Sequence, residues 1–521
     1  MKGSRAILES LLIGGVKVCF SNPGTSEMNF VASLDDVPEM RGILTLFEGV
    51  ASGAADGYAR IANHPAAVLL HLGPGLSNAG ANLHNARRAN SPIVTIVGDH
   101  ASFHLHHDPP LASDIDSLAS PISKAVLRAK DLYSLPEVTS DAVRASIQRP
   151  RGPVALIVPA DFTWLDADFN FESIDLFDKQ EANPIDVDFD PAVAALKAEG
   201  RVAFLIGREA MSQQGVTSVE RVAQRYGALV LSETFSSVID RGRGVPNPDK
   251  LSYFGEGALA QLAGVSTLIL IGASRPVAFF AYPDKPSSLV PEGCSVIDLT
   301  PCGEDAAAVA ACLAEQLGVS DFEIALSEHP LAPIVDGPLT ASSVATVLSH
   351  LLPEGAIVSE ESVTAALSSY LQTRGSAPHR WMNLMGGAIG QGMPLATGAA
   401  VASPTSKVIN IQADGSSLYT IQSLWTQARE NLDVVTILLN NRAYAILQLE
   451  FGRVGAERAG DQSQSMLNLF PPELDFVRIS EGFGVPATRA TTVREFTVQL
   501  EEALAARGPR LIEAYLPVGL S

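Results

Sequence analysis

Two oxygen-bearing side chains stand where apolar runs end in the last third of the sequence. The run KVINIQ leads to Asp414, and the run VVTILL ends at Asn440 and Asn441. Both runs have the apolar, β-branched character of strands that are covered on both faces of a parallel sheet. If the strands are neighbours, Asp414 and Asn441 project from the carboxyl edge of the sheet, where open parallel sheets bind ligands. Their carboxylate and amide oxygens could then share one cation, and Mg²⁺ prefers such hard oxygen ligands.

The segment between these runs predicts a turn and then a helix. Gly415 permits a tight turn, and Ser416 or Ser417 can cap the helix after it. Apolar residues at helical spacing run from Leu418 to Leu432, and the polar residues expected to face water are Gln427, Arg429 and Glu430. The N–H groups at the start of this helix would suit phosphate, so the pattern favours a diphosphate ligand held through Mg²⁺. The alternative is a plain βαβ unit whose turn happens to contain Asp-Gly-Ser.

The Asp-Gly-Ser sequence, with the second asparagine 27 positions after the aspartate, resembles the thiamine diphosphate signature of the acetolactate synthase and benzoylformate decarboxylase superfamily. The resemblance covers nearly the whole chain, although Ala413 stands where the signature usually has glycine. It implies that the metal is held at Asp414, Asn441 and Ala443. It also implies cofactor contacts at Pro23, Gly24, Thr25, Gly415, Ser416 and Tyr444.

The same resemblance demands a carboxylate in the first quarter of the chain. In the family, a glutamate hydrogen-bonds the aminopyrimidine ring, so that the ring's amino group becomes an imine able to take the thiazolium C2 proton. Glu48 fits this role, because ILTLFEGVASGAADGYAR places it after an apolar strand and before a helix of small residues. Glu48 could instead be an ordinary acid at a helix start, where the helix dipole stabilises a carboxylate by about 0.3–1 kcal/mol.

Two further segments resemble family loops that contact the cofactor. GGAIGQGMP is similar to the segment that forces the cofactor into a V shape, which assigns the aliphatic wedge to Ile389 and the carbonyl acceptor to Gly387. SEESVTA is similar to a loop that touches the diphosphate, through Glu361, Ser362 and Thr364. The alternative is that Ile389 is a core residue of a glycine-rich turn and that the polar loop residues are simply solvated.

Histidines are the candidate proton carriers. His71, in LLHLGPGLSN, stands where benzoylformate decarboxylases carry a histidine, although the GPG after it is more like acetolactate synthases. The loop HLHHDPPLASDI contains His104, His106 and His107, and its adjacent histidines resemble those that relay protons in pyruvate decarboxylases. A histidine with a pKa of about 6.5 can exchange protons near neutral pH. We expect catalytic roles for His71, His106 and His107; an exposed His-rich loop or a zinc site are the alternatives for the trio.

The reaction implied by the resemblance is decarboxylation of a 2-oxo acid, which ends in an aldehyde or, after attack on a second carbonyl, in an acetolactate-type product. Asp99 replaces a glutamine of strict acetolactate synthases, and Leu449 and Glu450 stand at the place of their substrate-selecting tryptophan. Phe279 and Phe280 stand where benzoylformate decarboxylases place a second histidine. No stretch resembles a flavin-binding segment, so no FAD is expected. A simple decarboxylase, a flavin-dependent oxidase and a non-catalytic scaffold on this fold are the alternatives.

The composition is that of a globular protein, with 46% hydrophobic and 18% charged residues in 521. The net charge of −21 would repel nucleic acid and anionic lipid, so neither is expected as a partner. The 4 cysteines lack CxxC spacing, which predicts reduced packing residues in a cytoplasmic protein. No apolar run approaches the roughly 20 residues of a membrane span.

Strand and helix patterns alternate in three blocks, which predicts an α/β fold with three parallel-sheet domains. The expected limits are a pyrimidine-binding domain at 1–165, a central Rossmann-like domain at 191–326 and a diphosphate-binding domain at 339–521. The segment from Thr163 to Asp190 shows no period and predicts a linker. Because the family binds its cofactor between the first block of one subunit and the third block of another, the resemblance implies a homodimer or homotetramer with active sites at the subunit interface and a 2-oxo acid as substrate.

Overall fold

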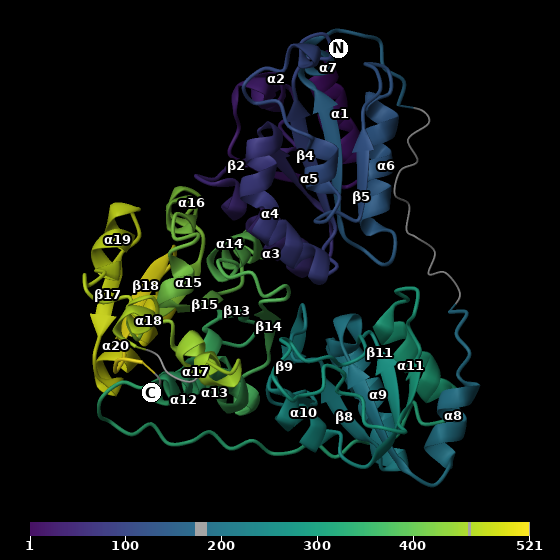
Figure 1. Cartoon of the computed structure of the whole chain (residues 1–521), viewed down its shortest axis with the longest axis vertical. Coiled ribbons are helices and arrows are strands. Elements are labelled where there is room, and N and C mark those ends of the chain that lie inside the picture. Colours follow the sequence, from purple (N-terminus) through teal and green to yellow (C-terminus); the bar gives the residue numbers. More distant parts are fainter. Residues whose placement is uncertain (172–184, 457–459, 520–521) are drawn as a thin grey trace.

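The computed structural model describes residues 1–171, 185–456 and 460–519. Three sheets, each covered by helices, succeed one another along the chain (Figure 1). We refer to each sheet with its helices as the N-terminal, central and C-terminal unit. The α/β fold with three mainly parallel sheets is therefore confirmed.

The N-terminal unit contains a six-stranded parallel sheet in the order β2-β1-β3-β4-β6-β5. Every residue of its three central strands is buried, as expected for apolar runs covered on both faces. The strands are β1 (Val18–Ser21), β2 (Arg41–Leu44), β3 (Ala66–Leu70), β4 (Ile93–Asp99), β5 (Ala125–Arg128) and β6 (Pro153–Pro159). The helices are α1 (Gly3–Ile13), α2 (Met28–Ser33), α3 (Glu48–Ala62), α4 (Leu72–Arg88), α5 (Ile115–Ala119), α6 (Leu135–Ile147) and α7 (Ala160–Trp164).

The central unit has a five-stranded parallel sheet in the order β10-β8-β7-β11-β12. Its strands are β7 (Arg201–Ile206), β8 (Leu229–Ser232), β10 (Asp249–Lys250), β11 (Val265–Ile271) and β12 (Ser295–Asp298). Its helices are α8 (Asp190–Lys197), α9 (Gln213–Tyr226), α10 (Gly255–Gln261) and α11 (Ala306–Gln316). The expected linker begins within α7, ends where α8 starts, and lies partly outside the described residues.

The C-terminal unit has a seven-stranded sheet in the order β17-β18-β16-β15-β13-β14-β9. Its strands are β13 (Ile357–Glu361), β14 (His379–Asn383), β15 (Val408–Ala413), β16 (Val434–Asn440), β17 (Ala487–Ala490) and β18 (Arg510–Tyr515). The remaining strand, β9 (Ile239–Arg241), comes from the central stretch of sequence and pairs antiparallel with β14. This strand lies inside the range 191–326 expected for the central domain, and the domain limits stay a prediction.

The helices of the C-terminal unit are α12 (Ala341–Leu351), α13 (Ala366–Gln372), α14 (Gly392–Ala402), α15 (Asp414–Ser417), α16 (Ser423–Arg429), α17 (Ala445–Arg453), α18 (Asp461–Ser465), α19 (Phe476–Gly482) and α20 (Val493–Ala505). Helix α14 packs along α3 of the N-terminal unit (Figure 1). The helices approach so closely that a Cβ at Gly57 would collide with the Leu395 carbonyl, and one at Gly398 with the Ala54 carbonyl. Glycine is required at both positions, and the contact joins the two units.

Within the described ranges, no helix combines the length and the apolar character that crossing a membrane requires. All four cysteines are free, and they differ in burial: Cys19 is buried, whereas Cys302 is exposed. The expectation that the cysteines act as packing residues therefore does not hold for Cys302.

Candidate active site

Strands β15 and β16 are parallel neighbours, as the sequence predicts. Their register pairs Ala413 with Leu439, so both strands end at the same carboxyl edge of the sheet. Asp414 begins α15 directly after β15, and Asn441 comes directly after the last residue of β16. The expected juxtaposition of a carboxylate and an amide at two adjacent strand ends is therefore present.

The two side chains are held by backbone donors. One carboxylate oxygen of Asp414 accepts a hydrogen bond from the Gly415 N–H at 2.7 Å, and the other accepts one from the Arg442 N–H at 2.6 Å. The Asn441 Oδ1 accepts from the Ala443 N–H at 3.1 Å. Burial raises the pKa of Asp414 to about 6, despite these donors. A cation at this edge would favour the ionised carboxylate.

A cavity of about 570 Å³ opens at these strand ends. Its volume lies within the roughly 300–1,000 Å³ typical of small-molecule sites. The wall combines polar groups with an apolar surface that includes Leu439, Ile446 and Met466. The predicted site residues that line it are Ser362, Thr364, Ile389, Asp414, Gly415, Ser416, Asn441, Ala443 and Tyr444. Half of the predicted residues, from separate segments of the chain, thus meet at one cavity.

Glu361 and Gly387 are not among the residues that line this cavity. Glu361 is buried behind it, where its carboxylate accepts hydrogen bonds from the N–H groups of Gly390 at 2.5 Å and Gly392 at 2.6 Å. The side chain of Gln412 donates to the same carboxylate at 3.0 Å, and burial raises the pKa of Glu361 to about 7. Glu361 therefore shapes the loop that carries Ile389.

The helix expected from Leu418 is interrupted. The structure has a single turn, α15, then a bend and then α16, and Tyr419 lies in the bend as a cavity-lining residue. The expectation that Gln427 faces water is wrong, because its side chain is fully buried and donates to Thr397 Oγ1 at 3.0 Å. The apolar periodicity indicated a helix but did not show that α14 covers this polar position.

The first three strands of the N-terminal unit also end in predicted site residues. Pro23, Gly24 and Thr25 come after β1, Glu48 comes after β2 and begins α3, and His71 comes after β3. The Glu48 carboxylate accepts from the Asn78 amide at 3.0 Å. A Cβ at Gly75 would touch both the Glu48 carboxylate and His71, each at 3.4 Å, so these two residues flank the same glycine.

An ion pair between Glu27 and His71 was not expected from the sequence. The two side chains approach to 2.8 Å, and the Gly24 N–H donates to the same Glu27 oxygen at 3.0 Å. Burial raises the pKa of Glu27, and the charge of His71 opposes that effect. The capping pattern of Glu27 three residues after Gly24 could have indicated its bond to the backbone, but not its contact with a histidine 44 residues away.

The N-terminal cluster does not reach the 570 Å³ cavity within one chain. All residues that line the cavity belong to the span from Ala341 to Gly519. The chain thus presents two separate sets of predicted site residues, one on each of two units. Assembly of these sets between two subunits stays a prediction.

The histidine loop lies outside the cavity lining. His106 and His107 belong to a short 3₁₀ turn, η3 (Leu105–His107), and both are exposed. Their ring centroids are 3.8 Å apart, and His104 lies beside His107 at 5.8 Å. Across the described part of the chain, no three His, Cys, Asp or Glu side chains converge on a possible metal position. A catalytic role for His106 and His107 stays a prediction.

Comparisons with known proteins identify the N-terminal and the C-terminal units. Residues 1–118 match the model of the thiamine pyrophosphate enzyme N-terminal TPP binding domain, and residues 362–514 match that of the C-terminal TPP binding domain. The chain is 49% identical to the Mycobacterium tuberculosis protein described as "Putative acetolactate synthase large subunit IlvX", over 99% of both chains. It is 30% identical to benzoylformate decarboxylase of Pseudomonas aeruginosa, over 98% of this chain and 97% of that protein.

A solved structure shows the same arrangement. The thiamine diphosphate-dependent 4-hydroxybenzoylformate decarboxylase of Rhodococcus jostii RHA1 superposes with a TM-score of 0.87 and 25% sequence identity, covering 100% of both chains. The similarity includes all three units, so the central unit belongs to the shared fold.

Proposed function

The chain belongs to the thiamine pyrophosphate enzyme family, and we propose that it uses thiamine diphosphate and Mg²⁺ to decarboxylate a 2-oxo acid. The observation that carries this proposal is the pair of strand ends at the 570 Å³ cavity. A buried carboxylate, Asp414, and an amide, Asn441, lie there beside a glycine-rich loop bearing Ile389. These groups fit a metal-bound diphosphate, because Mg²⁺ takes a few oxygen ligands from protein and the rest from phosphate and water.

In this proposal, Asp414, Asn441 and the backbone at Ala443 hold the metal. Gly415, Ser416, Ser362 and Thr364 surround the diphosphate. A Cβ at Gly415 would strike the ring of Tyr444, so the tight turn depends on glycine at this position. Ile389 supports the cofactor rings, and the buried carboxylate of Glu361 fixes the loop that presents it.

In the proposed assembly, Glu48 of the partner subunit completes the site. The separation of the two sets of predicted site residues within one chain supports this arrangement. The carboxylate of Glu48 would hold the aminopyrimidine in the tautomer that accepts a proton. The bound cofactor supplies the electron sink that takes the electron pair released with carbon dioxide. The bond from Asn78 orients the Glu48 carboxylate at 3.0 Å.

His71 is the proposed carrier of the proton that reaches the product, and Glu27 is its positioning residue. The 2.8 Å contact between them lets the carboxylate select the tautomer and orientation of the imidazole. Ser26 Oγ adds a second contact to the same ring nitrogen at 3.3 Å. No FAD is expected in this proposal, and the purified protein should be colourless.

Two outcomes of the reaction differ in the step after the loss of carbon dioxide. The acetolactate synthase named among the relatives favours union with a second carbonyl. The aldehyde outcome is favoured by His71, by the benzoylformate decarboxylase relative and by the 4-hydroxybenzoylformate decarboxylase structure. We place carboligation first and simple decarboxylation second; a non-catalytic scaffold is the remaining alternative.

Product identification decides among them. The holoenzyme is incubated with pyruvate, benzoylformate, 4-hydroxybenzoylformate and longer 2-oxo acids, and carbon dioxide and organic products are measured by mass spectrometry. An acetolactate-type product supports the first outcome, and a free aldehyde supports the second. Cofactor binding without carbon dioxide from any acid would overturn the proposed reaction and favour the scaffold.

A further inference from the structure

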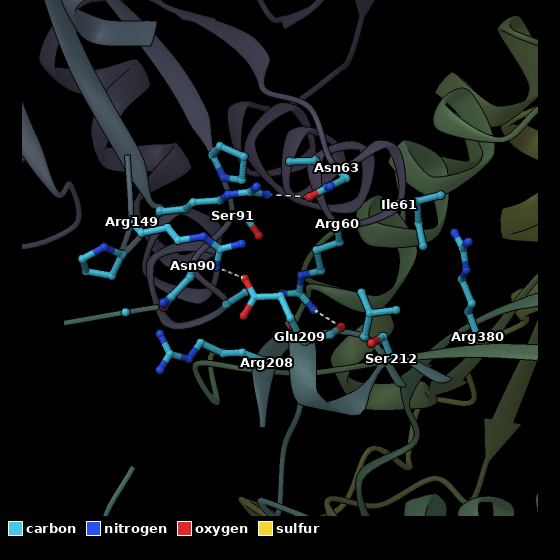
Figure 2. Close-up of a pocket in the computed structure, with 18 of the residues that line it drawn as sticks. Arg60, Ile61, Asn63, Asn90, Ser91, Arg149, Arg208, Glu209, Ser212 and Arg380 are labelled. Carbon is cyan, nitrogen blue, oxygen red and sulfur yellow. Dashed lines mark hydrogen bonds and ion pairs between the residues drawn. The ribbon is translucent and has the colours of Figure 1, made fainter. Parts of the chain in front are cut away.

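A second cavity, of about 290 Å³, lies where the three units meet (Figure 2). The N-terminal unit contributes Arg60, Asn90 and Arg149 to its wall, the central unit contributes Arg208 and Glu209, and the C-terminal unit contributes Arg380. The residues that line it share no member with those lining the 570 Å³ cavity. A ligand here would therefore contact residues of all three units.

The wall is strongly cationic. Five arginines line the cavity, Arg151 being the fifth, whereas the carboxylates in the lining are Glu209 and Asp240. The cavity is therefore locally positive, although the net charge of the whole chain is −21. Such concentration of one sign inside an interdomain cavity raises the local concentration of oppositely charged ligands.

The arginines differ in how far the protein compensates them. Arg60 forms two hydrogen bonds to the buried Asp56, at 2.8 and 2.6 Å. Arg149 bonds to Glu209 at 2.5 Å and to Asp305 at 2.6 Å. These two cations are therefore neutralised within the protein.

Arg151 and Arg208 form no ion pair with a described carboxylate, although Glu209 and Asp305 lie near enough to Arg151 to raise its pKa. Arg151 donates to the neutral Asn63 side chain at 2.5 Å, and its Nε is buried without a hydrogen-bond partner among the described residues. Burial lowers the pKa of Arg151, and the nearby charge of Arg149 lowers it further. Arg208 donates to neutral oxygens of Gly272 and Thr300.

Arg380 reaches the cavity from β14 and forms a long ion pair with Asp240, whose carboxylate oxygen lies 3.7 Å from Nε. Its side chain is 51% exposed, so it can turn toward a ligand. Neutral donors complete the wall, since Asn90, Ser91 and Ser212 also line it. Two guanidinium groups without an ion pair, an exposed third one in a long ion pair and neutral donors between them form a donor set that suits a tetrahedral oxyanion.

We propose that this cavity binds a small, doubly charged oxyanion, either free phosphate or the phosphate group of a small metabolite. The 290 Å³ volume is below the usual range for larger ligands, which limits the occupant to a few non-hydrogen atoms beyond the phosphate. Several arginines favour phosphate over a single carboxylate, because phosphate carries more charge and has enough oxygens to pair with more than one guanidinium fork. The bound anion would relieve the repulsion between Arg149 and Arg151.

Hydrogen bonds connect this cavity to the loop that carries Ile389. Two residues of its wall, Arg60 and Ser91, donate hydrogen bonds to the buried carboxylate of Asp56. The bond from the Ser91 hydroxyl is 2.5 Å long. The side chain of Gln391 donates to the same carboxylate at 2.6 Å. Gln391 lies between Gly390 and Gly392, whose N–H groups Glu361 holds. An anion that drew on Arg60 or Ser91 would therefore alter the support of Ile389, which gives the site a route to regulate the enzyme.

Calorimetry of the holoenzyme, saturated with thiamine diphosphate and Mg²⁺, tests the proposal with two probes at constant ionic strength: inorganic phosphate and glycerol phosphate. Saturating cofactor keeps the probes out of the diphosphate site. We expect saturable binding that Arg151→Gln and Arg380→Gln each weaken about tenfold or more, since each removes charge-assisted hydrogen bonds. The matched control is Arg144→Gln on the exposed face of α6, which removes the same charge outside the cavity lining.

The two probes identify the source of the oxyanion. Tighter binding of glycerol phosphate supports a phosphorylated metabolite, and tighter binding of inorganic phosphate supports the free ion. If Arg151→Gln does not fold, the exposed Arg380 still gives a testable variant. The proposal is overturned if neither probe binds at concentrations up to about 10 mM, or if binding is the same in wild type and in Arg380→Gln. Because no readout uses the catalytic reaction, the result does not depend on the proposed decarboxylation.

Discussion

Asn440 and Asn441 are identical and adjacent residues with different surroundings. Asn440 is buried and donates to Glu513 at 2.6 Å, whereas Asn441 lines the 570 Å³ cavity. The pleat of β16 sends successive side chains to opposite sides, so only one of the pair can face the proposed metal. Sequence reasoning selected Asn441 through a family spacing; the structure supplies the physical reason.

Asn441→Ala should weaken the Mg²⁺-dependent binding of thiamine diphosphate by at least about tenfold, because it removes one of the few metal ligands that the protein offers. Asn440→Ala is the matched control, and we expect it to lower the thermal stability while leaving cofactor affinity within a factor of about two. Titration calorimetry at several Mg²⁺ concentrations measures both. Equal affinities in Asn441→Ala and wild type would remove the metal assignment.

Glu48→Gln should keep cofactor binding and lower the rate of C2 proton exchange by about 10²–10⁴-fold, the range expected when a positioned proton-transfer group is lost. Glutamine preserves the shape and the contact with Asn78 but cannot serve as the same strong acceptor. Exchange of the C2 proton with deuterium, monitored by NMR, measures the step directly. Glu39→Gln, an exposed change in the same unit, is the control, and unchanged exchange in Glu48→Gln would refute the assigned role.

Helices α3 and α14 show how small residues bring two units together. Gly57 and Gly398 sit where the backbones of the two helices touch, and neither position has room for a Cβ. Small side chains elsewhere along α3 allow the same approach, which explains the Ala- and Gly-rich stretch after Glu48. The stretch GVASGAADG, which follows the proposed catalytic Glu48, thus packs α3 against α14.

Gly57→Ala should destabilise the protein by roughly 1–3 kcal/mol through overpacking, although alanine favours a helix. Gly482→Ala is the comparison, because a Cβ there meets nothing within 4 Å, and it should leave stability unchanged or raise it slightly. Denaturant unfolding of both variants gives the two free energies. A Gly57→Ala variant as stable as wild type would show that α3 and α14 are not tightly packed in solution.

His379 at the start of β14 predicts acid sensitivity of the sheet. Burial, aided by the charge of Arg241, lowers the pKa of His379 to about 3 in the folded protein. Below a pH of about 6.5 the unfolded chain therefore binds a proton that the folded chain does not, and stability falls as pH falls toward 3. The contribution of His379 to the slope is about 1 kcal/mol per pH unit between pH 6 and 4.

His379→Gln should flatten this slope, whereas His350→Gln, at an exposed histidine, should not. Unfolding free energies measured across this pH range in urea provide the test. Parallel pH curves for wild type and His379→Gln would mean that the histidine is not buried in its neutral form.

The elements that were predicted well from the sequence are the ones with a strong local signal. The apolar runs at β15 and β16 indicated both strands and their carboxyl edge, because burial on both faces leaves a continuous apolar pattern. The bend at Tyr419 and the pairing of β9 with β14 could not be predicted, since both depend on partners far away in the sequence. The contact between Glu27 and His71 could not be predicted for the same reason, because the two residues are far apart in the sequence and only the tertiary fold brings them together.

At the scale of the molecule, the chain carries two sets of predicted site residues that do not line one common cavity among the described residues. Glu48 and His71 lie on the N-terminal unit, and the metal-binding candidates lie on the C-terminal unit. In the proposed function a second copy joins them, so the proposed oligomer would be part of the active site. The chain segment between β8 and β10 of the central unit supplies β9 to the C-terminal sheet, and the central unit also lines the arginine-lined cavity, so it contacts both other units.

Subunit complementation tests this arrangement most directly. Glu48→Gln and Asp414→Asn chains, each inactive alone, are co-expressed with different tags, and the mixed dimers are purified through both tags. If each site combines Glu48 of one subunit with Asp414 of the other, every mixed dimer contains one intact site and should release carbon dioxide from the best 2-oxo acid at about half the wild-type rate. Mixed dimers as inactive as their parents would contradict the shared site.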